Sequence, residues 1–339
     1  MNRMGRMARG SLMAGLAAAV ALLATLGVFA ARGAPPVGDP YARPGQLVSL
    51  PDHRKLNFRC AGRGAPTVLL ESGYNAGSNA WGKVVPRIAP VTRVCAYDRA
   101  GYGFSDPGPM PRDGAAIARD LDYGLQAANI SGPFVVVGHS AGGLYARLFA
   151  ARRPKDVVGL VFVDSSVSHQ TQRFELLFGP NAGSLAGTRA QAQRCLDAVS
   201  GPPKTVDDPA VASCAPPILD APARQAALRP LTWQTRLSEL DTLFTSTSDE
   251  VDRVGDLLQD IPAIVLTAAK GDGDAGVATD PGGRAWQEFH RQLASGFHPS
   301  EQRFVKSSHL IMIERPEVVA DAALQLVQAA RKPAPPHAR

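Results

Sequence analysis

Charged and aromatic residues are scarce in this chain of 339 residues, at 19% and 6% of the sequence. No basic stripe with interleaved aromatic residues occurs, which argues against nucleic-acid binding. The net charge of +6 owes three charges to arginines within the first ten residues. A hydrophobic content of 45% is nevertheless typical of a folded protein. The length suffices for one large α/β domain with a sizeable core, or for two modest ones.

Only one long apolar run is present, and it lies at the N-terminus. Arg3, Arg6 and Arg9 precede an uncharged stretch over residues 11–31 that ends in small residues. This order predicts a signal peptide within residues 1–31. The run is also about as long as a membrane-spanning helix, so an uncleaved anchor stays open. Both outcomes place the body of the protein outside the cytoplasm, in the periplasm or outside the cell.

Cysteine is rare too, with Cys60, Cys95, Cys195 and Cys214 as the only four. None of them lies in a CxxC pair or in a cysteine–histidine cluster with zinc-like spacing, so we expect no metal site. An even number of cysteines in a chain that is exported favours two disulfide bonds instead.

Strand-like and helix-like segments alternate after a proline-rich linker at 32–44. Continuous apolar strands that alternate with helices predict a mostly parallel sheet covered on both faces. The strand candidates are 45–50, 54–60, 66–71, 92–98, 133–138, 157–164, 261–268 and 301–307. Helical spacing occurs at 113–129, 141–153, 283–295 and 316–331.

The sixth and seventh predicted strands are separated by about 95 residues, far more than a usual crossover connection. We interpret residues 166–240 as a cap over the sheet, followed by a crossover helix near 241–258. The whole α/β domain is expected to span residues 45–331. The tail at 332–339 is predicted to be disordered.

The segment Gly138-His139-Ser140-Ala141-Gly142 matches the G-x-S-x-G motif. It lies between a predicted strand and a predicted helix, which is the context that this motif requires of a nucleophilic serine. The turn also directs the Ala141 amide and the helix N-terminus toward developing negative charge. A glycine-rich helix start with an N-capping serine is the simpler alternative, but it does not require a strand, a turn and a helix in this order.

A nucleophilic serine needs a base, an acid and a second oxyanion donor. His309 follows the last predicted strand and precedes the last helix, where a loop can return to the serine. Two strand-end residues can orient it, Asp164 first and Asp272 as the alternative acid. The loop after the third strand holds Gly73, which permits a tight turn, and the Tyr74 amide, which is the natural donor beside Ala141.

The chain resembles the α/β-hydrolase superfamily, most of all exported bacterial members with a YDRAGYG[W/F]SD segment. The segments ESGYNAG, YDRAGYGFSD, GHSAGG, FVDSS and SSHLIMIERPE carry this resemblance in that order, roughly over residues 45–331. It implies an eight-stranded, mostly parallel sheet with a helical cap inserted after strand 6. It further implies serine-dependent hydrolysis, usually of an ester, without a cofactor. Relatives with an aspartate nucleophile, the haloalkane dehalogenases and epoxide hydrolases, differ here because Ser140 occupies that position.

The resemblance also bears on the acid and on the cysteines. Superfamily members usually carry their acid after the seventh strand, whereas others carry it at the place that matches Asp164. In the superfamily's strand order the second strand lies beside the fourth, which implies a Cys60–Cys95 disulfide. Cys195 and Cys214 then pair within the cap.

We therefore expect an exported, monomeric carboxylic-ester hydrolase that acts on a small-molecule ester through an acyl-enzyme. We expect it to need no cofactor and no metal, and to meet a membrane only through a possible N-terminal anchor. Three alternatives stay open: a C–C bond hydrolase, a cofactor-free haloperoxidase with the same triad, and a non-catalytic binding protein.

Overall fold

The computed structural model describes residues 40–215, 221–269 and 278–332. The predicted signal peptide or anchor at 1–31, the linker up to residue 39 and the tail from residue 333 lie outside the described residues. Within the described part of the chain, no helix is long and apolar enough to cross a membrane.

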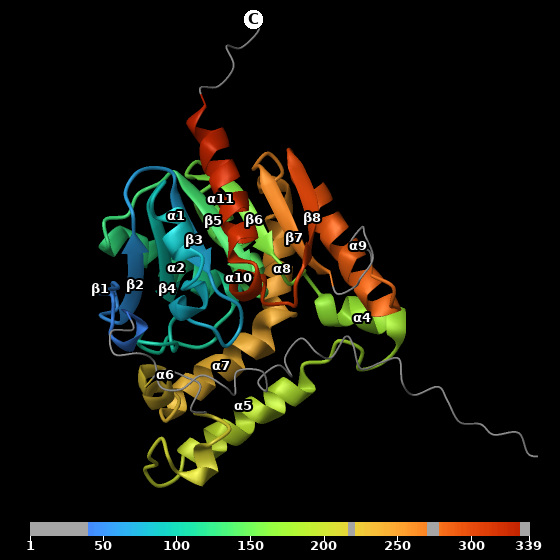
Figure 1. Ribbon diagram of the computed structural model, residues 1–339. Coiled ribbons are helices and arrows are strands. Elements are labelled where there is room, and N and C mark those ends of the chain that lie inside the picture. The colour runs from blue at the N-terminus through green and yellow to red at the C-terminus, as the bar shows by residue number, and fades with distance from the viewer. Residues whose placement is uncertain (1–39, 216–220, 270–277, 333–339) are drawn as a thin grey trace, which may run out of the picture.

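Eight strands form one sheet in the order β1-β2-β4-β3-β5-β6-β7-β8 (Figure 1). The pairs β1–β2 and β2–β4 are antiparallel, and all other neighbours are parallel. This confirms the eight predicted strands and the mostly parallel sheet. The strands are β1 (Gln46–Ser49), β2 (Lys55–Ala61), β3 (Thr67–Glu71), β4 (Val94–Asp98), β5 (Phe134–His139), β6 (Val157–Val163), β7 (Ala263–Ala269) and β8 (Ser300–Lys306).

Helices cover both faces of the sheet and enclose a separate core on each. The central strand β5 shows why, since Val136 belongs to one core while Val135 and Val137 belong to the other. Alternate side chains of a strand point to opposite faces, so an all-apolar strand fits this double burial. One face carries α2 (Gly114–Ala127), α3 (Gly142–Arg152), α8 (Ser246–Arg253) and α9 (Pro281–Ser295), and the other carries α1 (Val85–Ile88), α10 (Ile311–Glu314) and α11 (Pro316–Arg331).

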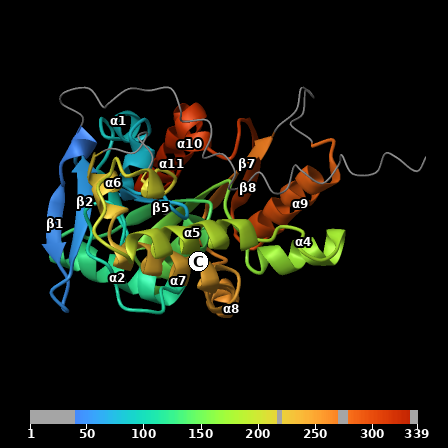
Figure 2. The same cartoon turned by 90° about the horizontal axis from the view of Figure 1, so that it is seen from below.

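The connection between β6 and β7 forms a helical insertion. Its helices α5 (Ala186–Val199) and α7 (Pro230–Leu243) pack against each other along the end of the sheet where the parallel strands finish (Figures 1 and 2). They enclose a third apolar core that contains Trp233 and the Cys195–Cys214 disulfide. Before α8 the insertion comprises α4 (Gln170–Phe178), α5 (Ala186–Val199), η5 (Pro209–Val211), α6 (Ala221–Ala226) and α7 (Pro230–Leu243).

The crossover helix expected near 241–258 is not one continuous helix. It comprises the end of α7, then α8, then a short 3-10 turn η6 (Gly255–Leu257). The backbone leaves the helical conformation at Thr245 (φ −121°, ψ −107°), which lets α8 turn onto α2 and α3. The expected boundary at residue 240 therefore falls inside α7. Two further 3-10 turns are η3 (Pro40–Ala42) and η4 (Ser78–Trp81).

Both implied disulfides are present. Cys60 and Cys95 face each other in the register of β2 and β4, with their Cα atoms 4.1 Å apart. Cys195 on α5 is joined to Cys214, which lies after η5. Two disulfides and no free cysteine among the described residues are typical of a protein from an oxidising compartment.

Candidate active site

Ser140 lies on the turn between β5, which ends at His139, and α3, which begins at Gly142. Its backbone φ is +51°, a conformation that a residue with a side chain rarely adopts. Two hydrogen bonds hold the strained turn: the Ser140 amide donates to the Val163 carbonyl (3.2 Å), and the Ser166 amide donates to the Ser140 carbonyl (2.9 Å). Residues held in such strained backbone conformations cluster at functional sites, which makes Ser140 a candidate functional residue.

The loop after β3 lies directly against this turn. A Cβ atom on Gly142 would come within 2.4 Å of the Glu71 carbonyl oxygen and 2.7 Å of that of Ser72. A Cβ atom on Gly73 would lie 3.0 Å from the Cβ of Ser140. Neither position leaves room for a Cβ atom, which explains the glycines at both positions.

The two predicted oxyanion donors belong to these adjacent segments. Ala141 is the N-cap residue of α3, where backbone amides have no acceptor within the helix. Tyr74 follows Gly73 in the loop that lies against Ser140. The two sequence-predicted donors thus belong to two segments that meet at Ser140.

His309 lies on a short loop between β8 and α10 whose shape depends on one carboxylate. Glu314 Oε2 accepts hydrogen bonds from the Ser307 hydroxyl (2.9 Å) and the Ser308 amide (2.8 Å). Glu314 Oε1 accepts one from the Ser308 hydroxyl (2.6 Å). The two serines that precede His309 therefore fix the loop that presents it.

Asp164 and His309 are hydrogen-bonded to each other. The distance between Asp164 Oδ2 and His309 Nδ1 is 2.7 Å, across 145 residues of sequence. The other carboxylate oxygen accepts from the Trp286 indole (2.8 Å) and from the Ala268 amide (2.9 Å). Burial alone raises the pKa of Asp164, but the contact with His309 outweighs it and the pKa is lowered. Asp164 is therefore a buried, ionised acceptor.

His139 links the serine turn to the His309 loop. Its Nε2 donates a hydrogen bond to the His309 carbonyl (3.0 Å), and the two rings lie 4.6 Å apart. Burial, followed by the nearby His309 ring, lowers the pKa of His139 to about 3, so this ring is neutral. Because the carbonyl can only accept, the proton of His139 lies on Nε2.

The structure brings Ser140, His309 and Asp164 to one region but does not join all three directly. Among the described residues, no hydrogen bond to the Ser140 hydroxyl is formed. Catalytic hydrogen bonds are often long before substrate binds. The alternative acid Asp272 lies outside the described residues. The described ranges hold no group of three or more side chains placed to bind a metal.

Two supporting residues were missed by the sequence reasoning. Trp286 and His290 lie one turn apart on the buried side of α9, with ring centroids 4.5 Å apart. Trp286 contacts Asp164, and His290 Nε2 donates to the Ser165 carbonyl (2.8 Å). His290 Nδ1 accepts from the Thr267 hydroxyl (2.8 Å). In the sequence, the only signal for Trp286 and His290 was the i, i+4 spacing of their two amphipathic rings.

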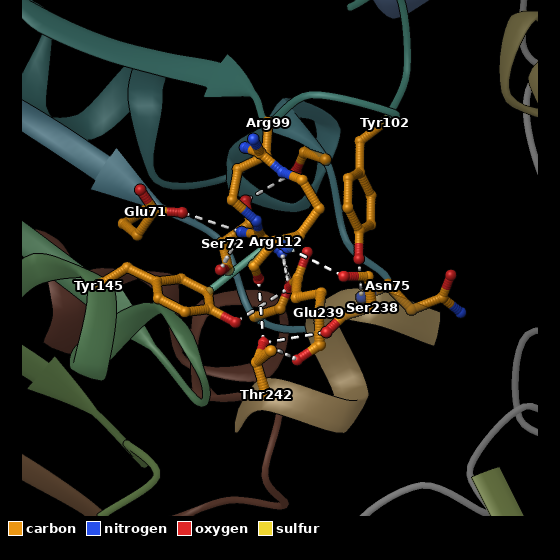
Figure 3. A network of polar contacts seen from close by, with 12 residues as sticks. Glu71, Ser72, Asn75, Arg99, Tyr102, Arg112, Tyr145, Ser238, Glu239 and Thr242 are labelled. Atoms are coloured by element: carbon orange, nitrogen blue, oxygen red, sulfur yellow. Dashed lines mark hydrogen bonds and ion pairs between the residues drawn. The ribbon is translucent and has the colours of Figure 1, made fainter. Parts of the chain in front are cut away.

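A buried charged cluster beside the loop after β3 was missed as well (Figure 3). Arg99 lies after β4 and contacts Glu71 at the end of β3 and Glu239 on α7, both at 2.8 Å. The Tyr145 hydroxyl of α3 donates to the same Glu239 oxygen (3.2 Å). Arg99 stands in the YDRAGYG segment, but nothing in the sequence singles out Glu239.

Comparison with known proteins supports the fold and the superfamily. A family model for the alpha/beta hydrolase fold matches residues 66–194. An uncharacterised protein of Schizosaccharomyces pombe is 33% identical over 151 residues, which are 36% of this chain and 28% of that protein. An AB hydrolase superfamily protein of Gibberella zeae is 34% identical over 105 residues, 30% of this chain and 33% of that protein.

Among solved structures, a thermophilic esterase from Thermogutta terrifontis with malate bound is similar, with a TM-score of 0.57 and 20% identity. The match covers 85% of this chain and 99% of the esterase. The chain spans less than half the length of the two curated relatives, so their sequence matches concern only part of each. The sheet order, the family match over residues 66–194 and the structural similarity together show that the chain has the α/β-hydrolase fold.

Proposed function

We propose that this protein is a serine hydrolase that cleaves a carboxylic ester through the triad Ser140, His309 and Asp164. The observation that supports this most is the 2.7 Å hydrogen bond between Asp164 and His309. It connects a loop after β8 to the end of β6, beside a strained serine turn. An ionised, buried carboxylate that accepts from a histidine ring is the arrangement that orients a general base.

In the proposed reaction the Ser140 hydroxyl oxygen attacks the ester carbonyl carbon while His309 takes the hydroxyl proton. The oxyanion that forms accepts hydrogen bonds from the Tyr74 and Ala141 amides. The C–O bond to the alcohol then breaks, and His309 gives its proton to the leaving alkoxide. His309 then takes a proton from a water molecule, whose oxygen attacks the acyl carbon; the bond to Ser140 breaks, His309 returns the proton to the serine oxygen, and the carboxylic acid leaves.

The proposed setting is outside the cytoplasm. The basic and apolar order of residues 1–31 supports export, and the two disulfides agree with an oxidising compartment. We propose a monomer that acts on a small-molecule ester, with no nucleic acid, metal or cofactor involved. Any contact with a membrane would be made through the N-terminal segment.

The test is hydrolysis of p-nitrophenyl esters of graded acyl length, with Ser140→Ala as the matched variant. Wild-type protein should turn over at least one ester and should be labelled by a fluorophosphonate, which reacts with activated serines. Ser140→Ala should lose both properties while its thermal unfolding stays unchanged. A wild-type protein that neither hydrolyses nor takes up the label would refute the proposal and favour a binding protein of the same fold.

A further inference from the structure

Arg99 is a buried cation with an unusual set of acceptors. Only 2% of the residue is exposed, and its guanidinium donates to two carboxylates and two backbone carbonyls. The carbonyls belong to Ser72 (2.5 Å) and Gly73 (2.8 Å). Burial alone lowers the pKa of Arg99, but the carboxylates of Glu239 and Glu71 outweigh it, so Arg99 stays charged.

The two carbonyls are those of the loop that carries the proposed oxyanion donor. The peptide bond between Gly73 and Tyr74 is trans, so its C=O and N–H point in opposite directions. When the Gly73 carbonyl faces Arg99, the Tyr74 amide must therefore face away from Arg99. The Ser72 carbonyl fixes the preceding peptide in the same way, and the loop cannot rotate without breaking charge-assisted hydrogen bonds.

The insertion contributes the last contact of this arrangement. Glu239 on α7 accepts from Arg99 Nη2, the same nitrogen that donates to the Gly73 carbonyl. Glu239 is 1% exposed and lies 140 residues beyond Arg99 in sequence. In Figure 3 the side chains of Arg99, Glu71 and Glu239 converge between the loop and the α7 ribbon.

We propose that Arg99 is a positioning residue that holds the Tyr74 amide in its oxyanion-binding orientation, and that Glu239 couples this orientation to the insertion. Arg99 acts through the loop and does not touch the substrate. This inference rests on the proposed function, because it assigns a task to the oxyanion loop. With this role for Arg99, the catalytic rate depends on the contacts that Arg99 makes with Glu239 on α7 and with Glu71 at the end of β3.

The main test compares Arg99→Lys with Arg112→Lys. Arg112 is a matched control because it is 1% exposed and ion-paired with Asp120 at 2.7 Å, and among the described residues Asp120 is the only hydrogen-bond partner of its side chain. A lysine at position 99 keeps the charge but cannot form the guanidinium's parallel hydrogen bonds. We expect kcat for a p-nitrophenyl ester to fall about 10- to 100-fold with KM changed less than about threefold, since the removal of an oxyanion donor itself costs 10²–10³ in kcat. Arg112→Lys should leave both constants near wild type.

A second readout does not depend on catalysis. Hydrogen exchange of the backbone amides in residues 72–76, followed by mass spectrometry, should be faster in Arg99→Lys than in wild type and unchanged in Arg112→Lys. Glu239→Gln, which leaves the loop carbonyls bonded to Arg99, should change both readouts in the same direction but less. It also replaces Arg99→Lys if that variant does not fold.

The outcomes separate the two proposals. A wild-type protein without esterase activity or fluorophosphonate labelling contradicts the proposed function, while the exchange experiment still tests the role of Arg99 in holding the loop. Wild-type exchange rates in Arg99→Lys, or an unchanged kcat in an active enzyme, would overturn the inference about Arg99. An equal loss of kcat in Arg112→Lys would show a general effect of replacing buried arginines and would also overturn the inference about Arg99.

Discussion

Replacement of Asp164 by asparagine tests the role of this residue with little change in shape. The Oδ1 oxygen accepts from two groups that can only donate, the Trp286 indole and the Ala268 amide. The new side chain must therefore keep its oxygen there and turn its NH2 group toward His309. His309 Nδ1 then has to accept a hydrogen bond, so the ring proton moves to Nε2. A histidine protonated at Nε2 cannot take the Ser140 proton.

The expected loss is large because the substitution removes both the correct tautomer and the charge that stabilises the imidazolium. The corresponding substitution in a serine protease lowers kcat about 10⁴-fold, which equals about 5 kcal/mol of transition-state stabilisation. We expect a loss of this order for Asp164→Asn. Thermal unfolding should shift far less, since the buried oxygen keeps its two donors.

The assay is steady-state hydrolysis of the ester that wild type prefers, with Asp272→Asn measured in parallel. The variant at Asp272 should stay within about threefold of wild type if Asp164 alone orients the base. The reasoning would be wrong if Asp164→Asn kept a tenth or more of the wild-type kcat. It would also be wrong if Asp272→Asn alone produced the large loss, because the acid would then lie after β7.

Two further substitutions test the packing around the site and in the insertion. Gly73→Ala should lower kcat at least tenfold, because its Cβ would lie 3.0 Å from the Cβ of the proposed nucleophile. Gly187→Ala on α5 meets nothing within 4 Å, so it should leave activity unchanged and add up to about 1 kcal/mol of stability. Measurement of kcat and of urea unfolding for both variants checks this, and equal activities would contradict it. Replacement of Cys195 and Cys214 by alanine removes a cross-link with a sequence separation of 19 residues. The free energy of unfolding, measured by urea titration, should fall by about 3 kcal/mol. An unchanged midpoint would refute the expected contribution of the disulfide.

Much of the fold was predictable from the sequence because its signals are local. Several of the eight strands are short apolar runs that alternate with helical segments, and each strand lies where the pattern indicated. The break between α7 and α8 was not predictable, since the sequence around Thr245 carries neither glycine nor proline. The backbone leaves the helix there because α8 packs onto α2 and α3, which is a tertiary contact.

The sequence by itself determined which eight segments form strands, the strained serine turn and the loop position of His309. These follow from glycines, β-branched residues and spacing, which act within a few residues of one another. Only the tertiary structure decided that Asp164 meets His309 and that Arg99 meets Glu239, across 145 and 140 residues. The sequence carries no periodic pattern that identifies such pairs. A buried charge must be paired, but its partner is set by which elements the fold brings within hydrogen-bonding distance.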